Sequence, residues 1–355
     1  MTAVDLGLPD LGGLDLIPTT DDPQKAKDYK SDQEVRWCPG CGDYVVLNAI
    51  QSFLPTLGLK PENIVFISGI GCSSRFPYYM NTYGMHSIHG RAPTIATGLA
   101  VSRPDLSVWV VTGDGDALSI GGNHLVHALR RNVNLKILLF NNRIYGLTKG
   151  QYSPTSEQGK VTKSTPMGSL DNPFNPVSLA LGAEATFVGR AVDHDRKGLT
   201  EVLQAAAAHR GTALVEIYQN CPIFNDGAFD VLKDREESER RIINLRHGEP
   251  ITFGPNQEYG VVRSTSGGLE VAKVNEVSTS ALVVHDATLA DPAQAFALSR
   301  LTDSSLEHTV TGIFRNVSHP TYDDLAREQV THARQAKTPD LRKLLHGQDT
   351  WTVVA

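Results

Sequence analysis

A carboxylate and an amide at a fixed spacing are the side chains in this sequence best suited to hold an ion. Asp114 lies between Gly113 and Gly115, and Asn142 follows it by 28 positions. Mg²⁺ binds about six oxygen atoms, which carboxylates, amides, carbonyls, waters and bound phosphates supply. Glycines next to the carboxylate would let the backbone approach a diphosphate closely. The pair therefore predicts a magnesium diphosphate site, whereas Gly-Asp-Gly alone would predict only a turn.

The elements around this pair place it at the edge of a sheet. Residues 107–112 and 135–140 are short apolar runs typical of buried parallel strands, and apolar residues recur between them at helical spacing. Ligands of such sheets bind beyond the carboxyl ends of the strands. Asp114 and Asn142 each follow a strand, so the two side chains are expected to converge on one ion.

The four cysteines form a second set of candidate ligands. Cys38 and Cys41 form a CxxC pair, while Cys72 and Cys221 each follow a strand-like run that would bring them to the same rim as Asp114. Two thiolates on a tight loop can bind one metal centre, which is either zinc or an iron–sulfur cluster. The cysteine count alone does not choose between these two.

The amino-terminal residues argue against structural disulfides. The first seventeen residues carry no Lys or Arg and contain Asp5, Asp10 and Asp15, the reverse of the positively charged start of a secretory leader. We therefore expect a cytoplasmic protein, and disulfides are rare in that compartment.

The spacing of the Asp and Asn resembles the thiamine diphosphate motif, which implies Asp114, Asn142 and the carbonyl of Ile144 as magnesium ligands. About residues 36 to 230 resemble the β subunit of 2-oxoacid:ferredoxin oxidoreductases, most closely the 2-oxoglutarate type of actinobacteria. Six motifs carry this resemblance: WCPGCGD (37–43), GIGCSS (69–74), HGRAP (89–93), GDGDA (113–117), NN (141–142) with YGLTKGQ (145–151), and NCP (220–222).

The resemblance implies roles for further residues. The four matching cysteines, Cys38, Cys41, Cys72 and Cys221, are implied to bind one [4Fe-4S] cluster. Arg75 and Leu147 occupy places that line the substrate pocket in relatives, and Arg75 and Lys149 are candidates to pair with a substrate carboxylate. The implied surround of the cofactor consists of Gly71, Cys72, Ser73, His89, Gly90, Gly113, Asp114, Gly115, Asp116, Ala117, Asn142 and Ile144.

An activity is implied by the same resemblance. Relatives carry out the oxidative decarboxylation of a 2-oxoacid with thiamine diphosphate and coenzyme A, and electrons pass through the cluster to ferredoxin. The expected reaction converts 2-oxoglutarate to succinyl-CoA and CO₂. Three alternatives stay open: specificity for pyruvate or a broad range of 2-oxoacids, a non-redox thiamine diphosphate enzyme with a structural zinc site, and an electron-transfer subunit without thiamine.

Only half of a thiamine site is visible in the sequence. The resemblance implies that a separate α subunit carries the pyrimidine-binding domain, its Glu and most of the coenzyme A site. The last roughly 120 residues are short for a second doubly wound domain, since domains commonly have about 100 to 200 residues. We expect an obligate αβ complex, either as αβ or dimerised to (αβ)₂.

Composition and pattern divide the chain into three parts. Its 355 residues are 40% hydrophobic, enough for a large core, and a net charge of −6 argues against nucleic acid as a partner. No apolar stretch approaches membrane-spanning length.

Residues 1–35 are expected to be an arm that wraps a partner or stays mobile. Residues 36–232 are expected to form a doubly wound, mostly parallel α/β domain of the thiamine diphosphate-binding type. Residues 233–355 are expected to be a C-terminal extension that serves as scaffold or interface.

Local patterns also predict individual elements. Helices are predicted near residues 44–54, 93–101, 117–130, 199–209, 293–301 and 322–336, and strands near 259–262 and 281–285.

Overall fold

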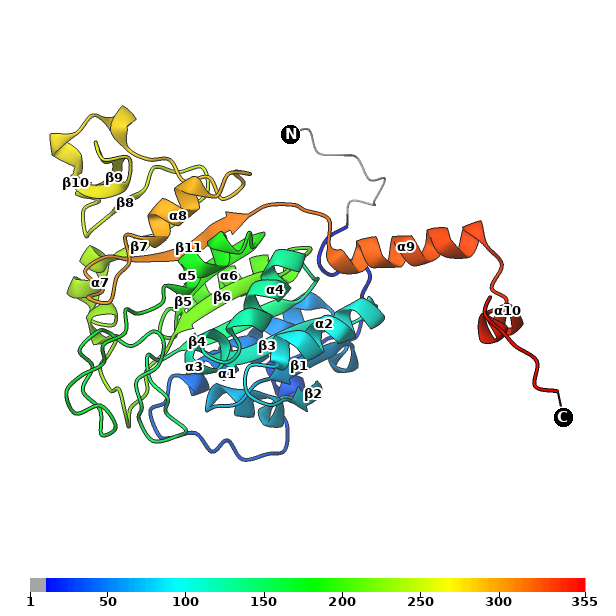
Figure 1. Ribbon diagram of the computed structural model, residues 1–355. Helices are drawn as coiled ribbons and strands as arrows, with labels where there is room; N and C mark the ends of the chain where they lie inside the picture. Colours follow the sequence, from blue (N-terminus) through cyan, green and yellow to red (C-terminus); the bar gives the residue numbers. More distant parts are fainter. Residues whose placement is uncertain (1–10, 355) are drawn as a thin grey trace.

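Five mainly apolar, buried strands and one short exposed strand form the parallel part of one large sheet in the computed structural model, which describes residues 11–354 (Figure 1). Within these residues the sheet has eight strands, and only its β5–β11 pairing is antiparallel. This architecture confirms the predicted mostly parallel α/β fold. In spatial order the strands are β2 (Tyr83–His86), β1 (Ile64–Ser68), β3 (Ser107–Gly113), β4 (Lys136–Asn141), β6 (Ala213–Tyr218), β5 (Phe187–Val192), β11 (Thr309–Asn316) and β7 (Ile242–Asn244).

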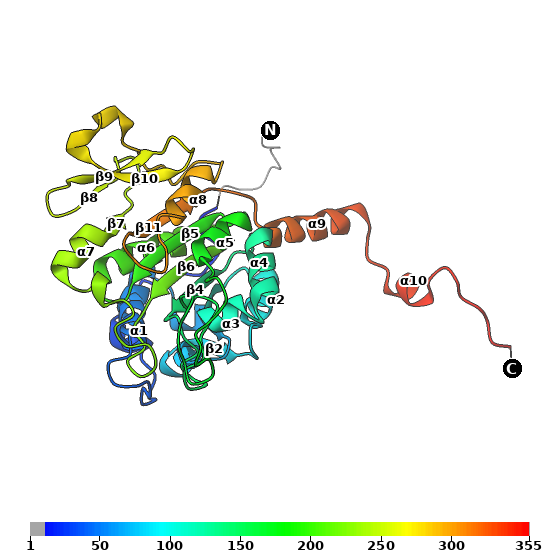
Figure 2. The same ribbon diagram turned by 60° about the vertical axis from the view of Figure 1, so that its left-hand side comes forward.

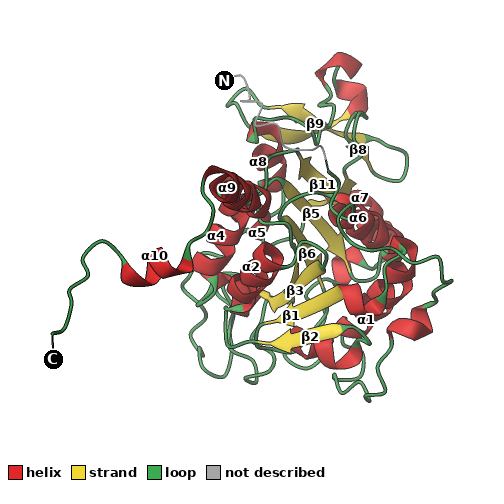
Figure 3. Cartoon of the chain, turned by 90° about the vertical axis from the view of Figure 1, so that its right-hand side faces the viewer, coloured by secondary structure: helices red, strands yellow, loops and turns green. Residues whose placement is uncertain are grey.

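Helices cover both faces of the sheet, as Figure 3 shows in a view along it. One face packs against α1 (Asp43–Phe53) and α6 (Arg196–Ala208), and the other against α2 (Ala92–Ser102), α4 (Gly122–Arg131), α5 (Pro176–Gly182) and α8 (Ala293–Ser299). Successive strand residues alternate between the two cores, so Trp109 packs on the α1 side and Val110 on the α2 side. Each fully buried side chain of this size contributes about 1.5–3 kcal/mol to folding. Burial on both faces explains why β1 and β3 are almost wholly apolar.

The order of the strands creates a crevice at β1. From β1 the chain first adds β2 on one side and then crosses to add β3 on the other. Such a reversal separates the loops that follow the two neighbouring strands, and ligands bind there at the carboxyl ends. The loop after β1 carries Cys72, and Asp114 follows β3 directly as the first residue of the next helix.

The helix predicted for residues 117–130 is in fact two helices, so this prediction was wrong in its continuity. α3 (Asp114–Leu118) ends at Ser119, and α4 begins at Gly122. A Cβ atom on Gly121 would lie 2.4 Å from the carbonyl oxygen of Asp116 and 2.9 Å from the Cα of Gly90. This close backbone approach, together with the poor helix propensity of glycine, interrupts the helix.

The C-terminal segment contributes to the same sheet, which the sequence patterns did not predict. β11 pairs antiparallel with β5 and parallel with β7, while β8 (Thr252–Phe253), β9 (Tyr259–Arg263) and β10 (Leu269–Lys273) form a separate small sheet (Figure 2). The strand predicted near 259–262 is β9. The strand predicted near 281–285 is wrong, because only isolated bridges at Leu282 and Val284 form there.

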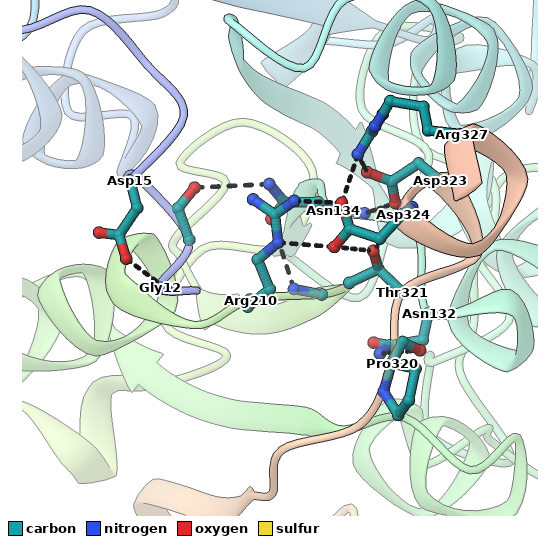
Figure 4. A network of polar contacts seen from close by, with 12 residues as sticks. Gly12, Asp15, Asn132, Asn134, Arg210, Pro320, Thr321, Asp323, Asp324 and Arg327 are labelled. Atoms are coloured by element: carbon teal, nitrogen blue, oxygen red, sulfur yellow. Dashed lines mark hydrogen bonds and ion pairs between the residues drawn. The ribbon is translucent and has the colours of Figure 1, made fainter. Parts of the chain in front are cut away.

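A polar network anchors the helix that leaves the body near the C-terminus (Figure 4). α9 (Tyr322–Ala336), which has the bounds that were predicted, is capped by Thr321. Arg210, just before β6, binds both oxygens of Asp324, and Arg327 binds Asp324 and Asp323 from within the helix. Beyond this network α9 and α10 (Leu341–His346) extend away from the body in Figures 1 and 2.

The described part of the N-terminal arm packs on the chain's own domain. Ile17 and Tyr29 are buried in the core on the α1 side, and the Tyr29 hydroxyl donates to the carbonyl of Leu59. Residues 11–35 thus pack against the domain through buried side chains. Residues 1–10 lie outside the described part of the chain.

The remaining elements are short. α7 (Arg235–Arg241) consists almost wholly of charged residues, and its N-terminus is capped by Asp234. Between residues 11 and 354, no helix has both the length and the apolar character that crossing a membrane requires. The 3-10 helices are η1 (Ala26–Tyr29), η2 (Leu54–Leu57), η3 (Pro61–Asn63), η4 (Ser73–Tyr79), η5 (Asp230–Leu232), η6 (Val274–Glu276) and η7 (Thr279–Ala281).

Candidate functional site

One cavity at the carboxyl ends of β1, β3 and β4 gathers most of the predicted site residues. It has a volume of about 60 Å³. The loops after these strands contribute the predicted lining residues Gly71, Cys72, Ser73, His89, Gly113, Asp114, Gly115, Asp116, Asn142, Ile144 and Leu147. The topology therefore brings the carboxylate, the amide and a cysteine to one place.

Asp114 is a buried carboxylate held by two hydroxyl groups. Its Oδ2 accepts hydrogen bonds from Ser153 Oγ at 2.5 Å and from Thr155 Oγ1 at 2.6 Å. Burial raises the pKa of Asp114 to about 6, and the hydrogen bonds from Ser153 and Thr155 oppose this rise. A buried carboxylate is costly without a positive counterion, and a bound cation would offset that cost.

Asn142 and Ile144 form the other side of the candidate ion site. Asn142 is 9% exposed, and its Oδ1 accepts a hydrogen bond from the amide of Ile144 at 3.2 Å. Asn225 binds the carbonyl of Asn142 and fixes this turn. Arg143, between the two, has a φ of 56°, a left-handed conformation that turns the chain sharply. A carboxylate, an amide oxygen and a backbone carbonyl are the oxygen donors that Mg²⁺ prefers, so these residues fit the ion.

Gly115 is required by the close packing of Tyr145. A Cβ atom at Gly115 would lie 2.2 Å from Cε1 of the Tyr145 ring. The Tyr145 hydroxyl donates to the carbonyl of Gly115 at 3.0 Å. This contact ties the loop after β3 to the loop after β4, so the two candidate ion ligands keep a fixed separation.

Asp116 connects three of the loops around the cavity. Its Oδ1 accepts hydrogen bonds from the amides of Ile70 and Gly90, and its Oδ2 accepts one from Thr112 Oγ1. His89 Nδ1 lies 3.0 Å from Oδ1 of the same carboxylate. Asp116 thus positions the loops after β1 and β2 against the start of α3.

The loops that carry the four cysteines are joined by hydrogen bonds. Trp37 Nε1 donates to the carbonyl of Cys72 at 2.7 Å, which links the CxxC loop to the loop after β1. The amide of Gly42 donates to the carbonyl of Asn220 at 3.0 Å, which links the same loop to the residue before Cys221. Three chain segments that are distant in sequence therefore meet beside the cavity.

Two of the thiols lie close to Gly146. A Cβ atom on Gly146 would be 3.5 Å from Cys72 Sγ and 3.6 Å from Cys221 Sγ, so the two sulfurs are separated by at most the sum of these distances, about 7 Å. All four cysteines are free thiols. In residues 11–354, no three His, Cys, Asp or Glu side chains are grouped closely enough to hold a single metal ion.

The thiols of Cys41 and Cys72 are neutral in the absence of a metal centre. Burial, with a smaller effect of Asp43, raises the pKa of the Cys41 thiol, and the same causes raise the pKa of Cys72 to about 12. Burial also raises the pKa of Asp43 to about 7, and neither of its oxygens accepts a hydrogen bond from the described residues. Metal binding at these thiols would therefore release protons. Four cysteine sulfurs are the donor set of a [4Fe-4S] cluster, and the residues fit that group.

Several predicted residues lie next to the cavity without lining it. Arg75 is half-buried, and its Nε donates to the Tyr79 hydroxyl. Gly90 and Ala117 are buried behind the lining, and Lys149 is exposed. Leu147, which does line the cavity, is 53% exposed.

The patterns in the sequence missed the residues that position Asp114. Ser153 and Thr155 lie in a loop without regular spacing, and only the tertiary contact reveals their role. Their signal was the pair of hydroxyl residues two and four positions after Gln151, the last residue of the YGLTKGQ motif.

The fold and the cavity at its strand ends define a thiamine diphosphate-binding enzyme domain. Residues 69–217 match the family model described as thiamine pyrophosphate enzyme, C-terminal TPP binding domain. The chain is 72% identical to 2-oxoglutarate oxidoreductase subunit KorB of Mycobacterium tuberculosis, and the alignment covers 99% of this chain and 95% of that protein. The chain therefore belongs to the family of 2-oxoacid:ferredoxin oxidoreductase β subunits, which confirms the resemblance.

Two further comparisons agree with this family. The chain is 46% identical to 2-oxoacid:ferredoxin oxidoreductase 2, subunit beta, of Aeropyrum pernix, over 56% of this chain and 64% of that protein. A solved structure of 2-oxoglutarate:ferredoxin oxidoreductase from Magnetococcus marinus, with 2-oxoglutarate, coenzyme A and succinyl-CoA bound, aligns with a TM-score of 0.75 and 33% identity. That alignment covers 93% of this chain and 98% of the other. These similarities confirm that the chain is an oxidoreductase subunit.

Proposed function

We propose that this chain is the β subunit of a cytoplasmic 2-oxoglutarate:ferredoxin oxidoreductase, which converts 2-oxoglutarate and coenzyme A to succinyl-CoA and CO₂. The observation that carries the proposal is the meeting of Asp114, Asn142 and Cys72 at one cavity, with Cys221 about 7 Å or less from Cys72. A redox centre next to a decarboxylation site has a clear use, because oxidative decarboxylation releases two electrons.

The ion site would be formed by the Asp114 carboxylate, the Asn142 amide oxygen and the Ile144 carbonyl. Gly113, where an added Cβ atom would meet no atom closer than 3.7 Å, leaves room for the diphosphate beside it. Thiamine diphosphate, when bound, supplies the carbanion chemistry of decarboxylation. The chain's own part is to hold the ion, orient the diphosphate and exclude water through the packing of Tyr145 on Gly115.

The four cysteines would hold one [4Fe-4S] cluster. Cys38 is exposed while Cys41 and Cys221 are buried, so one side of this site faces solvent. An exposed edge is where ferredoxin would collect electrons. The hydrogen bonds from Trp37 and Gly42 hold the three cysteine-bearing segments together.

A partner subunit is required to complete the site. Pockets that enclose small ligands usually have volumes of about 300–1,000 Å³. The cavity of about 60 Å³ formed by this chain is far below that range. We infer that an α subunit supplies the pyrimidine-binding side, with its Glu, and most of the coenzyme A site, in an αβ or (αβ)₂ assembly.

The choice of 2-oxoglutarate rests on the names of the relatives from M. tuberculosis and M. marinus. A second substrate carboxylate needs a cation, and Arg75 and Lys149 are the candidates on this chain. Leu147 at the mouth of the cavity would contact the substrate's carbon chain.

The test is ferredoxin reduction by the αβ complex, purified without oxygen, with 2-oxoglutarate, pyruvate and branched 2-oxoacids as substrates. We expect 2-oxoglutarate to give the highest kcat/KM, a brown complex containing about four irons, and bound thiamine. A strong preference for pyruvate would overturn the substrate assignment. A colourless complex that contains zinc and no iron would overturn the redox assignment.

A further inference from the structure

A second, larger cavity lies behind the candidate ion site. Its volume is about 420 Å³, within the range of small-molecule pockets. Asn141, Arg143 and Thr155 line it on the side of the ion site, while Asn142, between the first two, lines the cofactor cavity. The two cavities are thus separated by a wall in which Thr155 binds Asp114.

Arg143 places a buried cation in this second cavity. The side chain is only 6% exposed, and its Nη1 donates to the carbonyl of Ser304 at 2.9 Å. Its guanidinium carbon lies 5.7 Å from the centre of the Tyr218 ring and 5.1 Å from that of Phe229. These rings fix the orientation of the guanidinium but do not neutralise its charge.

The neighbouring buried arginine shows how this chain compensates such a charge. Arg190 is 1% exposed, and its Nε donates to Glu216 Oε2 at 2.6 Å. Within the described residues, Arg143 has no such carboxylate partner. The charge of Arg143 contributes to a lowered pKa of the Glu157 carboxyl, but Glu157 forms its ion pair with Lys160, at 2.9 Å. Buried charges are normally paired, so the missing partner of Arg143 points to a ligand.

A second guanidinium faces the same space. Arg300, which follows α8, lines the cavity and is paired with no carboxylate of the described chain. Asp303 also lines it, but its carboxylate accepts hydrogen bonds from the amide and the hydroxyl of Ser305. The buried Arg143 and the exposed Arg300 together outweigh the single carboxylate of Asp303, so the lining carries a net positive charge. Phe174 and Tyr218 provide apolar walls.

We propose that this second cavity binds a small organic anion through Arg143 and Arg300. Guanidinium groups bind carboxylates and phosphates by paired, charge-assisted hydrogen bonds, so the ligand carries one of these two groups. The ring walls and the volume favour a metabolite over a bare inorganic ion. The bound anion would contact the wall that contains Thr155, next to the carboxylate proposed to hold the magnesium ion.

The test is a calorimetric titration of the αβ complex saturated with Mg²⁺ and thiamine diphosphate. Succinate probes the carboxylate class and adenosine 5′-monophosphate the phosphate class, with succinamide and adenosine as their uncharged counterparts. We expect one of the two anions to bind once per β chain and its uncharged counterpart not to bind. Arg300→Gln should weaken that binding about tenfold or more, because it removes a charge-assisted contact.

Arg263→Gln is the matched control, because Arg263 is an exposed arginine on β9 outside this cavity. It should bind the anion as the wild type does. The proposal is overturned if neither anion binds, or if Arg300→Gln binds it with unchanged affinity, which would place the anion elsewhere. Because binding is measured directly, a failed activity assay would count against the proposed reaction and not against this site.

Discussion

At the scale of single residues, the candidate ion site depends on side chains that would not bind the ion themselves. Ser153 and Thr155 both donate to Asp114 Oδ2 and oppose the rise in its pKa that burial causes. Hydrogen-bonded partners of this kind orient a metal ligand and keep it ionised. The affinity for the ion should therefore depend on the two hydroxyl groups as well as on the carboxylate.

Replacing the carboxylate gives the most direct prediction. Asp114→Ala in the αβ complex should weaken the binding of Mg²⁺ and thiamine diphosphate roughly a hundredfold or more, because a charged ligand is lost. The visible absorption of the proposed cluster should stay, since the Asp114 carboxylate accepts its side-chain hydrogen bonds from Ser153 and Thr155 and is not one of the proposed cluster ligands. Bound thiamine and the visible spectrum are the measurements, and the exposed Asp349→Ala is the control. Full thiamine content in Asp114→Ala would refute the magnesium assignment.

Removing one hydroxyl should have a smaller effect. Thr155→Val keeps the shape of the side chain but removes a donor to Asp114, so Mg²⁺ affinity should fall about 10- to 100-fold. Thr155→Ser, which retains the hydroxyl, should restore most of it. Titration of the thiamine-loaded complex with Mg²⁺ measures the change, and equal affinities for valine and threonine would contradict the role given to this hydroxyl.

The sequence predicts the residues that follow strands better than the residues that support them. Asp114 and Asn142 could be predicted because each follows a recognisable strand in a βαβ unit. Ser153 and Thr155 reach Asp114 only through the path of a long irregular loop, and no local periodicity encodes that path.

At the scale of elements, one buried histidine joins α6 to the C-terminal strand. His209, which ends α6, lies 2.8 Å from Thr186 Oγ1 through Nε2 and 2.9 Å from Asn316 Oδ1 through Nδ1. Burial, with a further effect of the nearby Lys136, lowers the pKa of His209 to about 3. In the folded chain this imidazole therefore stays neutral down to about pH 3, whereas in the unfolded chain it is protonated below its usual pKa of 6.5.

This difference predicts how stability depends on pH. The pKa of His209 is lower in the folded state than its usual 6.5, so its contribution is fully present above pH 6.5 and is lost as the pH falls toward about 3. The loss should reach at most about 1.4 kcal/mol per pH unit. His209→Gln should reduce the slope of unfolding free energy against pH between 6 and 4, measured by urea unfolding. Parallel slopes for wild type and variant would contradict the prediction.

The local sequence pattern predicted correctly those helices and strands whose apolar residues recur without interruption. α9 has the predicted bounds because a capping Thr321 precedes a regular amphipathic run. β11 was missed because Gly312 interrupts its pattern and its partner, β5, lies more than a hundred residues earlier. Pairing over that distance is a property of the whole fold and leaves little local signal.

At the scale of the whole molecule, the chain presents an open half of a site. The cavity of about 60 Å³ lies at a rim whose neighbouring residues, such as Leu147, are half exposed. A rim of this kind needs a second surface before it can exclude water from a reaction.

The isolated chain should accordingly bind thiamine diphosphate poorly. With saturating Mg²⁺, we expect its affinity to be at least about tenfold weaker than that of the αβ complex, because one wall of the pocket is missing. Calorimetry on the two preparations measures the difference. Turnover of 2-oxoglutarate by the chain alone at the rate of the complex would contradict the shared site.

The late position of β11 in the chain has a consequence for biosynthesis. Until residues 309–316 leave the ribosome, the outer edge of β5 has no neighbour to accept its backbone hydrogen bonds. An open strand edge is prone to pair with other nascent chains, and translation adds only about 5–20 residues per second. The growing polypeptide can therefore associate wrongly through this edge for about several seconds. A chain truncated before β11 would keep the edge of β5 unpaired.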